Sequence, residues 1–327
     1  MVPSALPSLR WGLIGASRIA RNALVPAFRA AGQTLVGVAA RDPVRAQDFA
    51  ATMGIDRSYA SYAELIADPT IEAVYISLVN DGHLPWAQQA LASGKHVLCE
   101  KPLALSAEDV ETMRRAEASG GGVLMEAFCH IFHPRFDDLL ALVAAGKLGR
   151  LVSIEASFSN PMTDPDDYRH SKAMGGGAVY DLAGYCVSLA WLLAGRAPTT
   201  ASARFQPLGE VDGSAAMLLD FGTSQALIAV SLTAAAQQRL TVNGTAGTLT
   251  LDWPISNKNR AVSLDIAGER RDYAPGNPYQ AMVEDFVAGA TGQRQLKFGS
   301  GHALTQARIL DAIFASAASG NVVEVVS

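Results

Sequence analysis

The first hundred residues alternate short apolar runs with helical patterns, and this alternation limits the possible fold more than any other feature. Apolar runs occupy residues 11–15, 34–40, 73–77 and 96–99, and helical patterns at 18–31, 43–53 and 85–93 separate them. Runs that are apolar at every position predict strands buried on both faces, as in a parallel sheet covered by helices. The region therefore predicts an α/β fold, a doubly wound parallel sheet of the Rossmann type.

The pattern changes after about residue 122. Residues 136–145 and 178–194 favour helices, several strand-like runs follow between 200 and 265, and helical patterns return at 279–288 and 302–319. Turn signals at Asp212-Gly213 and Asn243-Gly244 favour an antiparallel sheet in this part. A chain of 327 residues is long for one core. We therefore expect a Rossmann domain at residues 1–124 and a second domain at 125–327.

Charge and cysteine usage exclude several classes of protein. The net charge is -5, and no basic run offers a surface for nucleic acid or for anionic membrane. Cys99, Cys129 and Cys186 form no C-x-x-C pair, which favours a reducing compartment over a disulfide framework. No apolar run approaches the length of a membrane span. These features predict a cytoplasmic protein with neither a nucleic acid nor a membrane as partner.

The first strand runs into Gly15-Ala-Ser-Arg-Ile-Ala20, a variant of the dinucleotide-binding fingerprint. The first glycine permits the backbone to approach a pyrophosphate, and the following helix presents unpaired N–H groups to that anion. Ser17 replaces the middle glycine, so a plain strand-to-helix turn stays an alternative.

The second strand ends in Val38-Ala-Ala-Arg41, where NAD-binding domains usually carry an acid for the ribose hydroxyl. A carboxylate would repel a 2′-phosphate, whereas a guanidinium binds it with two hydrogen bonds. Arg45 follows one helical turn later, and Asp42 is expected to cap its own helix. The pattern predicts a preference for NADP, with NAD as the less favoured cofactor. The alternative is that both arginines are solvated surface residues.

Two further segments carry groups suited to proton transfer. The fourth strand runs into Glu100-Lys101-Pro102, where Lys101 can bind a reacting hydroxyl unless it only pairs with Glu100. Three glycines precede Asp181 and Tyr185, which lie four residues apart and so share a helix face. A tyrosine becomes a usable base when a cation such as Lys101 lowers its pKa, and Asp181 could orient the substrate. The alternative is a core tyrosine and a capping aspartate.

Together these motifs resemble the Gfo/Idh/MocA family, the glucose-fructose oxidoreductase/inositol dehydrogenase family, from about residue 10 to the end. Because it has a tyrosine at position 185, the chain is similar to the subgroup of dimeric dihydrodiol dehydrogenases and NADP-dependent D-xylose dehydrogenases. The resemblance implies that the second domain binds the substrate and supports oligomerisation, and that it contains a large, mostly antiparallel open sheet. It also implies a homo-oligomer, a dimer or tetramer through that sheet, and no metal.

The resemblance implies Lys101 and Tyr185 as the catalytic pair, with Asp181 assisting. The expected cofactor-binding residues are Gly15, Ala16, Ser17, Arg18, Ile19, Arg41, Arg45, Ser77, Asn80, His83, Glu100 and Lys101. The expected substrate-binding residues are Lys101, Phe128, His130, Arg169, Asp181 and Tyr185. His130 and Ile131 depart from the aromatic residue and arginine of relatives. Cys129, His130 and His133 lack a further ligand nearby, so no metal site is expected.

These features predict an enzyme that moves a hydride between NADP and a hydroxyl or carbonyl carbon of a small polyhydroxylated substrate, a sugar at aldose C1. One alternative is a trans-dihydrodiol dehydrogenase or another carbonyl reductase. The other is a non-catalytic NADP-binding regulator, which would have no need of the pair Lys101 and Tyr185.

Overall fold

The computed structural model describes residues 6–256, 258–266 and 269–326, and its contacts divide the chain into two compact units. Unit 1 comprises Met1–Ala104, Glu108–Cys129 and Tyr279–Leu304, and unit 2 comprises Leu105–Ala107, His130–Pro278 and Thr305–Ser327. Residues 279–304, which the sequence pattern assigns to the second domain, therefore belong to unit 1.

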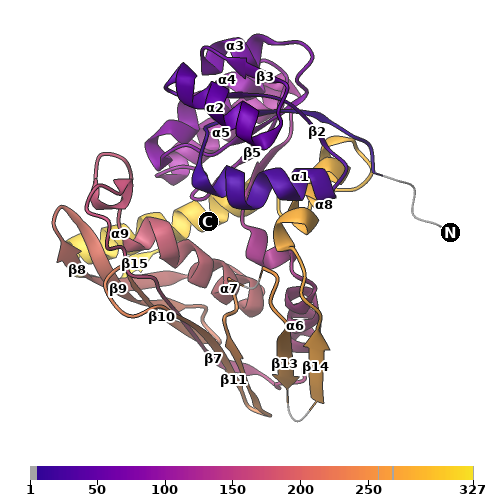
Figure 1. Cartoon of the computed structure of the whole chain (residues 1–327). Helices are drawn as coiled ribbons and strands as arrows, with labels where there is room; N and C mark the ends of the chain where they lie inside the picture. Colours follow the sequence, from indigo (N-terminus) through magenta and orange to yellow (C-terminus); the bar gives the residue numbers. More distant parts are fainter. Residues whose placement is uncertain (1–5, 257, 267–268, 327) are drawn as a thin grey trace. The chain divides into compact units, whose positions relative to one another are not determined.

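Unit 1 is built on a six-stranded parallel sheet in the order β3-β2-β1-β4-β5-β6 (Figure 1). The strands are β1 Arg10–Ile14, β2 Thr34–Ala39, β3 Arg57–Tyr59, β4 Ala73–Ile76, β5 His96–Cys99 and β6 Leu124–Glu126. This order confirms the doubly wound Rossmann sheet. Strands β3 and β6 were not expected, because three residues are too few to produce a recognisable apolar run.

The helical segments of this unit are η1 Ala20–Leu24, α1 Val25–Ala30, α2 Pro43–Met53, α3 Tyr62–Ala67, η2 Asn80–Gly82, α4 His83–Ala92, α5 Ala107–Gly120 and α8 Pro278–Ala290. Segments η1, α1, α2, α4 and α8 lie where the sequence pattern predicts helices, whereas α3, η2 and α5 were not expected. Segment η1 is a π-helix immediately ahead of Pro26, which lacks an N–H and crowds the carbonyl of residue 22 in an α-helix. The wider turn relieves that clash, so the helix continues through the proline.

Aromatic packing places α1 and α8 side by side on the sheet (Figure 1). The ring of Trp11 on β1 lies 4.5 Å from that of Phe28 on α1 and 5.2 Å from that of Phe286 on α8, measured between centroids. All three side chains are fully buried. This contact is the physical reason why α8 belongs to unit 1.

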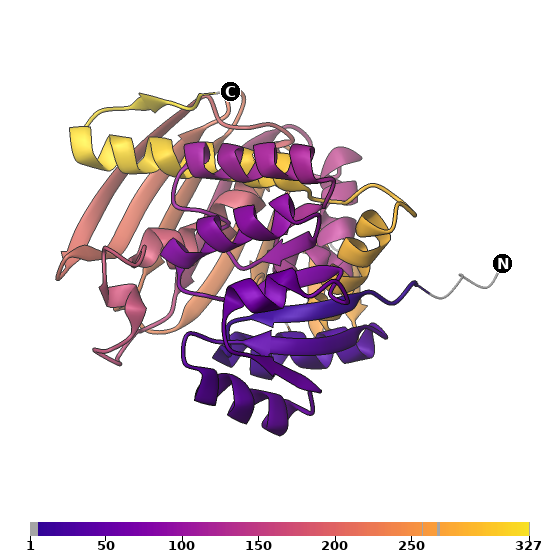
Figure 2. The ribbon, with the colours of Figure 1, turned by 90° about the horizontal axis from the view of Figure 1, so that it is seen from above.

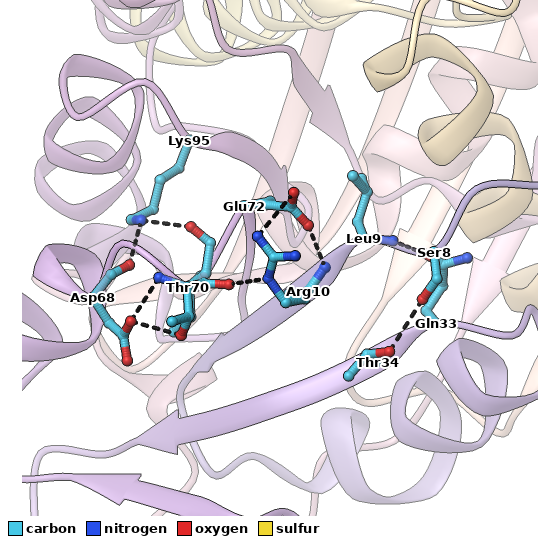
Figure 3. Close-up of polar contacts among 10 residues, drawn as sticks. Ser8, Leu9, Arg10, Gln33, Thr34, Asp68, Thr70, Glu72 and Lys95 are labelled. Carbon is cyan, nitrogen blue, oxygen red and sulfur yellow. Dashed lines mark hydrogen bonds and ion pairs between the residues drawn. The ribbon is translucent and has the colours of Figure 1, made fainter.

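The amino ends of the strands carry a polar network that is satisfied within the sheet edge (Figure 3). Arg10 Nη2 lies 3.1 Å from Glu72 Oε1, and the Arg10 N–H donates to the same carboxylate. The ammonium of Lys95 donates to the carbonyls of Asp68 and Ile71 at 2.9 and 2.7 Å. These groups hold the strand starts together, which leaves the carboxyl ends as the edge available for ligands.

Unit 2 contains a seven-stranded sheet in the order β12-β11-β7-β10-β9-β8-β15. Its strands are β7 Leu151–Ser159, β8 Thr200–Leu208, β9 Val211–Asp220, β10 Gln225–Ser231, β11 Gln237–Gly244, β12 Thr248–Asp252 and β15 Val323–Glu324, and β13 Val262–Ile266 pairs separately with β14 Glu269–Tyr273. Only β7 and β10 run parallel, which confirms a mostly antiparallel sheet.

The two turn signals of this region mark antiparallel hairpins but not the turn residues themselves. Asp212 and Gly213 are the second and third residues of β9, and Asn243 and Gly244 are the last two residues of β11, next to the turn into β12. The β8–β9 turn uses Gly209, whose φ of +62° suits a glycine. Asp212 does not form a turn. Its carboxylate instead accepts a hydrogen bond from the N–H of Val179 at 2.7 Å.

Helices cover one face of this sheet, and the other face is open. The helical segments assigned to unit 2 are η4 Tyr168–His170, α6 Pro134–Ala144, η5 Val179–Ala183, α7 Gly184–Ala194 and most of α9 Ser300–Ser319, and η3 Cys129–Phe132 begins at its boundary. Helix α9 lies along the covered face (Figures 1 and 2), where Phe314 packs against Phe205 of β8. On the opposite face, the paired residues Leu218 and Leu227 are 38% and 51% exposed. No helix in the described residues is long and apolar enough to cross a membrane.

Candidate active site

The turn after β1 brings two segments of backbone unusually close together. Gly15 has a φ of +111°, and a Cβ at this position would lie 2.8 Å from the carbonyl oxygen of Ser77. Ser17 Oγ donates to Ser77 Oγ at 2.9 Å and accepts the N–H of Ala20 at 3.0 Å. The serine that replaces the middle glycine of the fingerprint thus caps the helix and ties it to β4. Ala16 is buried, Ile19 is half-buried and Arg18 is exposed at the helix start.

The end of β2 presents two arginines. Arg41 and Arg45 are exposed, and Arg45 Nη2 donates to the carbonyl of Ala16 at 2.9 Å, which ties it to the turn after β1. Tyr62 from α3 bonds the backbone of Arg41, and burial raises the pKa of that phenol. Asp42 Oδ1 accepts the N–H of Val44 at 2.9 Å, which confirms it as the helix cap.

These features fit a dinucleotide. The space that a side chain on Gly15 would fill is the approach that a pyrophosphate needs, and the first N–H groups of the helix lie beside it. The guanidinium groups of Arg41 and Arg45 suit a 2′-phosphate because they offer paired N–H donors and positive charge.

Lys101 follows β5 in a loop that its neighbours fix in place. The Lys101–Pro102 peptide is cis. Glu100 Oε1 accepts the hydroxyl of Tyr75 at 2.6 Å, and Glu100 Oε2 lies 3.3 Å from the N–H of Lys101. The Lys101 side chain is half-buried at the carboxyl edge of the sheet.

His83 lies behind this loop. It is fully buried, with Nδ1 2.8 Å from the carbonyl oxygen of Pro102 and Nε2 3.1 Å from that of Leu78. Burial lowers the pKa of His83, so the ring is neutral at physiological pH. The contacts join the end of β4 to the Lys101 loop, and Asn80, in η2, is 4% exposed.

Glu126 is a site residue that the sequence analysis missed. It ends β6, directly beside Cys99 in the sheet register, and is 6% exposed. Its Oε1 accepts the N–H of Leu103 at 2.8 Å, so it supports the Lys101 loop from the neighbouring strand. Burial raises the pKa of Glu126 to about 8, although the charge of Lys101 acts to lower it. Its strand is too short to be recognised from the sequence, so no signal marked it.

In unit 2, Arg169 and Asp181 form a nearly buried ion pair. Arg169 Nε lies 2.9 Å from Asp181 Oδ2, and the two side chains are 20% and 7% exposed. Arg169 Nη1 also lies 3.1 Å from Asp167 Oδ1. Burial alone would lower the pKa of Arg169, but the charge and hydrogen bond of Asp181, together with the charges of Tyr168 and Asp167, raise the pKa above its usual value. The pair holds a guanidinium and a carboxylate in a fixed arrangement, which suits hydrogen bonds to polar groups.

The glycine-rich segment positions this pair. The N–H of Gly177 donates to the carbonyl of Arg169 at 2.9 Å, and a Cβ on Gly176 would lie 2.4 Å from the same oxygen. Asp212 then caps the following helix through the N–H of Val179. Burial raises the pKa of Asp212 to about 6. The glycines are therefore needed for close backbone contact and not only for flexibility.

Tyr185 lies in the first turn of α7, directly after the π-helical segment that carries Asp181. Its ring is half-buried and packs against His130 and Phe158, with centroids 5.1 and 5.7 Å away. His130 Nε2 lies 3.0 Å from Ser188 Oγ, which donates to the carbonyl of Tyr185. Asp181, Tyr185, Arg169 and His130 thus form one local arrangement in unit 2.

Two further expected residues, Phe128 and Ser77, are buried within unit 1. Phe128, expected to contact substrate, lies in unit 1 with 2% of its surface exposed. Ser77 is 6% exposed and bonds the turn after β1 through the carbonyl of Gly15. Among the described residues, no group of three His, Cys, Asp or Glu side chains is placed to hold a metal ion.

Comparison with known proteins identifies both units. Residues 9–128 match the oxidoreductase family with an NAD-binding Rossmann fold, and residues 136–250 match the GFO/IDH/MocA C-terminal domain. A D-xylose 1-dehydrogenase (NADP(+)) of Haloferax volcanii is 32% identical over 97% of this chain and 99% of its own length. A trans-1,2-dihydrobenzene-1,2-diol dehydrogenase of Xenopus laevis is 32% identical over 73% of each chain. These two relatives confirm the resemblance expected from the motifs.

The fold is also that of solved structures. A levoglucosan dehydrogenase in complex with NADH and levoglucosan superposes with a TM-score of 0.89 at 22% identity, covering 98% of this chain and all of the other. The chain therefore belongs to the Gfo/Idh/MocA family of NAD(P)-dependent oxidoreductases.

Proposed function

We propose that the protein is an NADP-dependent dehydrogenase that transfers a hydride to or from C1 of an aldose. The observation that carries the proposal is the Arg169–Asp181 ion pair on the segment that leads into Tyr185. A fixed carboxylate and guanidinium suit the hydroxyl groups of a sugar, since such groups both donate and accept hydrogen bonds. The xylose dehydrogenase of Haloferax volcanii supports the same substrate class.

The catalytic roles are divided between three side chains. When bound, the nicotinamide supplies the hydride in reduction and accepts it in oxidation. Lys101 binds the reacting oxygen through its ammonium group, and its positive charge favours the ionised form of a neighbouring phenol. Tyr185 takes the hydroxyl proton during oxidation and returns it during reduction, while Asp181 orients the substrate.

The choice of NADP rests on the end of β2. Arg41 and Arg45 offer two exposed guanidinium groups at the strand end, whereas the nearest acid in sequence, Asp42, caps its own helix. One relative is named for NADP and one solved homologue holds NADH, so the family uses both cofactors. The arginines are the feature of this chain that favours the phosphorylated form.

Substrate specificity would depend on the surroundings of Tyr185. We propose that Arg169 and Asp181 bind substrate hydroxyls and that His130 and Phe128 border the substrate. His130 is held by Ser188 beside the Tyr185 ring, so it acts in place of the aromatic residue expected from relatives.

We also propose that the protein forms a homodimer or homotetramer through the open face of the unit 2 sheet. Leu218 and Leu227 are exposed there on adjacent strands, which is unfavourable in water and becomes favourable when a second copy covers them. Light scattering of the purified protein would show a mass of two or four chains. Leu227→Lys should shift that mass toward the monomer.

The enzymatic proposal is tested with a panel of aldoses, inositols and trans-dihydrodiols, each with NADP and with NAD, followed at the nicotinamide absorbance. We expect turnover of an aldose with NADP, and a loss of about 100-fold or more in kcat for Lys101→Met and for Tyr185→Phe. Dinucleotide binding should persist in Tyr185→Phe, which serves as the folding control. Turnover of dihydrodiols alone would favour the second substrate class. Tight NADP binding without turnover of any substrate would favour a regulator.

A further inference from the structure

Unit 2 contains a cavity that none of the proposed catalytic residues lines. It has a volume of about 290 Å³ and is lined by the first turn of α6, by β12 and by the chain leading into β13. Pockets for small ligands begin at about 300 Å³, so this cavity suits a small molecule. Its polar lining residues are Arg135, Arg260, Thr250, Ser263 and Asp252.

Arg135 is a buried cation with no counter-charge among the residues that the structure describes. Its side chain is 3% exposed, and its Nη2 donates to the carbonyl of Trp253 at 3.2 Å. It forms no ion pair with any residue in the described parts of the chain. Burial lowers the pKa of Arg135 only to about 10, so the group stays charged at neutral pH. A buried charge is costly unless an opposite charge accompanies it.

The nearby carboxylates are already engaged. Asp138, one turn along α6, accepts the hydroxyl of Tyr273 at 2.5 Å and lies 3.4 Å from Arg271 Nη1. Asp252, which lines the cavity, is exposed and pairs with Arg239 at 3.4 Å. Neither of these two carboxylates forms an ion pair with Arg135.

Trp253 joins the two arginines. Its carbonyl bonds Arg135, and its ring lies 4.7 Å from the guanidinium carbon of Arg260. Its φ of +53° is a left-handed conformation that is strained for a bulky residue. Strain of this kind persists where the surroundings hold it in place, and such positions cluster at ligand-binding sites.

His133 adds another unsatisfied donor at the same place. Its Nδ1 accepts the N–H of Arg135 at 3.1 Å, so the neutral ring carries its proton on Nε2. Nε2 is buried and has no hydrogen-bond partner among the residues described. His133, Arg135 and Leu251 line a smaller cavity of about 10 Å³, which is room for one water, and Arg135 and Leu251 also line the larger cavity.

We propose that the larger cavity binds a small oxyanion, a carboxylate or a phosphate, between Arg135 and Arg260. Such a ligand supplies a negative charge beside Arg135 and acceptors for the guanidinium groups of the two arginines. The site is separate from the dinucleotide and from Tyr185, so it stands whether or not the proposed reaction is correct.

The test is calorimetric titration of the purified full chain with inorganic phosphate and with malonate, at an ionic strength matched with sodium chloride. We expect one saturable site for at least one of the two probes, and the probe that binds identifies the ligand class. Arg260 is exposed and its removal should be tolerated, so Arg260→Ala should weaken binding about tenfold or more.

Arg270→Ala is the matched control. Arg270 is 62% exposed, pairs with Asp272 on β14 and does not line the cavity, so the affinity should be unchanged. Phosphate that binds instead near Arg41 and Arg45 would be insensitive to Arg260→Ala. The proposal is overturned if neither probe binds more tightly than chloride, or if Arg260→Ala binds as tightly as the unaltered protein.

Discussion

Glu126 makes the stability of the protein depend on pH, and Glu126→Gln should remove that dependence. The glutamine keeps the shape of the protonated acid and keeps the oxygen that accepts the N–H of Leu103. The unfolded chain releases the Glu126 proton near pH 4.5, whereas burial raises the pKa in the folded protein to about 8. Between these values the folded state binds more protons than the unfolded state, so stability falls as the pH rises.

The size of the effect follows from the two pKa values. A difference between 4.5 and about 8, at about 1.4 kcal/mol for each pH unit, amounts to roughly 5 kcal/mol once the pH is above 8. At pH 7 roughly 3 kcal/mol of that loss is already present. Glu126→Gln should therefore match the unaltered protein near pH 4.5 and exceed it by about these amounts at pH 7 and above pH 8.

The assay is urea unfolding at fixed ionic strength from pH 5 to pH 9, followed by circular dichroism. Other titrating groups are shared by the two proteins, so they cancel in the difference between the two unfolding free energies. Glu111→Gln is the control, because Glu111 is 42% exposed and pairs with Arg114 at the surface, and it should show almost no pH-dependent difference. A stability difference for Glu126→Gln that is constant across this range would refute the reasoning.

Three further variants, one of them a double substitution, test the Rossmann unit. Arg41→Ala combined with Arg45→Ala should raise the Kd of NADP at least tenfold and leave the Kd of NAD nearly unchanged, as measured by fluorescence titration. Lys95→Met should lower the unfolding free energy in urea by roughly 2–4 kcal/mol, because two carbonyl groups lose their donor. Gly15→Ala should weaken NADP binding and lower Tm, because its Cβ would lie 2.8 Å from the oxygen of Ser77, whereas Gly32→Ala meets no atom within 4 Å and should retain binding.

The parts of the fold that could be predicted are those with a long local pattern. Strands β1, β2, β4 and β5 are apolar and buried over most of their length, and Pro43 with Asp42 marks the start of α2 in the sequence itself. The three-residue strands β3 and β6 have no such pattern, because pairing with a neighbour and not the apolar run defines them. The turn signal at Asp212-Gly213 misled because Asp212 serves a helix far away in the sequence.

The residues of the candidate site also fall into two groups, those that sequence motifs predict and those that only the folded structure brings together. Gly15, Lys101 and Asp181 stand in motifs with a recognisable residue spacing, so the sequence alone predicts them as site residues. Glu126 and Tyr62 act through contacts with Leu103 and with the backbone of Arg41, on other elements of the sheet edge. Such contacts exist only after the strands have assembled, and no local spacing encodes them.

A nascent copy of this chain cannot close the core of unit 1 until synthesis is nearly complete. The indole of Trp11 leaves the ribosome among the first residues, but the phenyl ring of Phe286 that covers it arrives only with α8. During the interval the apolar sheet has one uncovered surface, a state that favours aggregation. We therefore expect that a fragment ending at residue 129 would be captured by chaperones, and that cells produce the intact protein more reliably than either half.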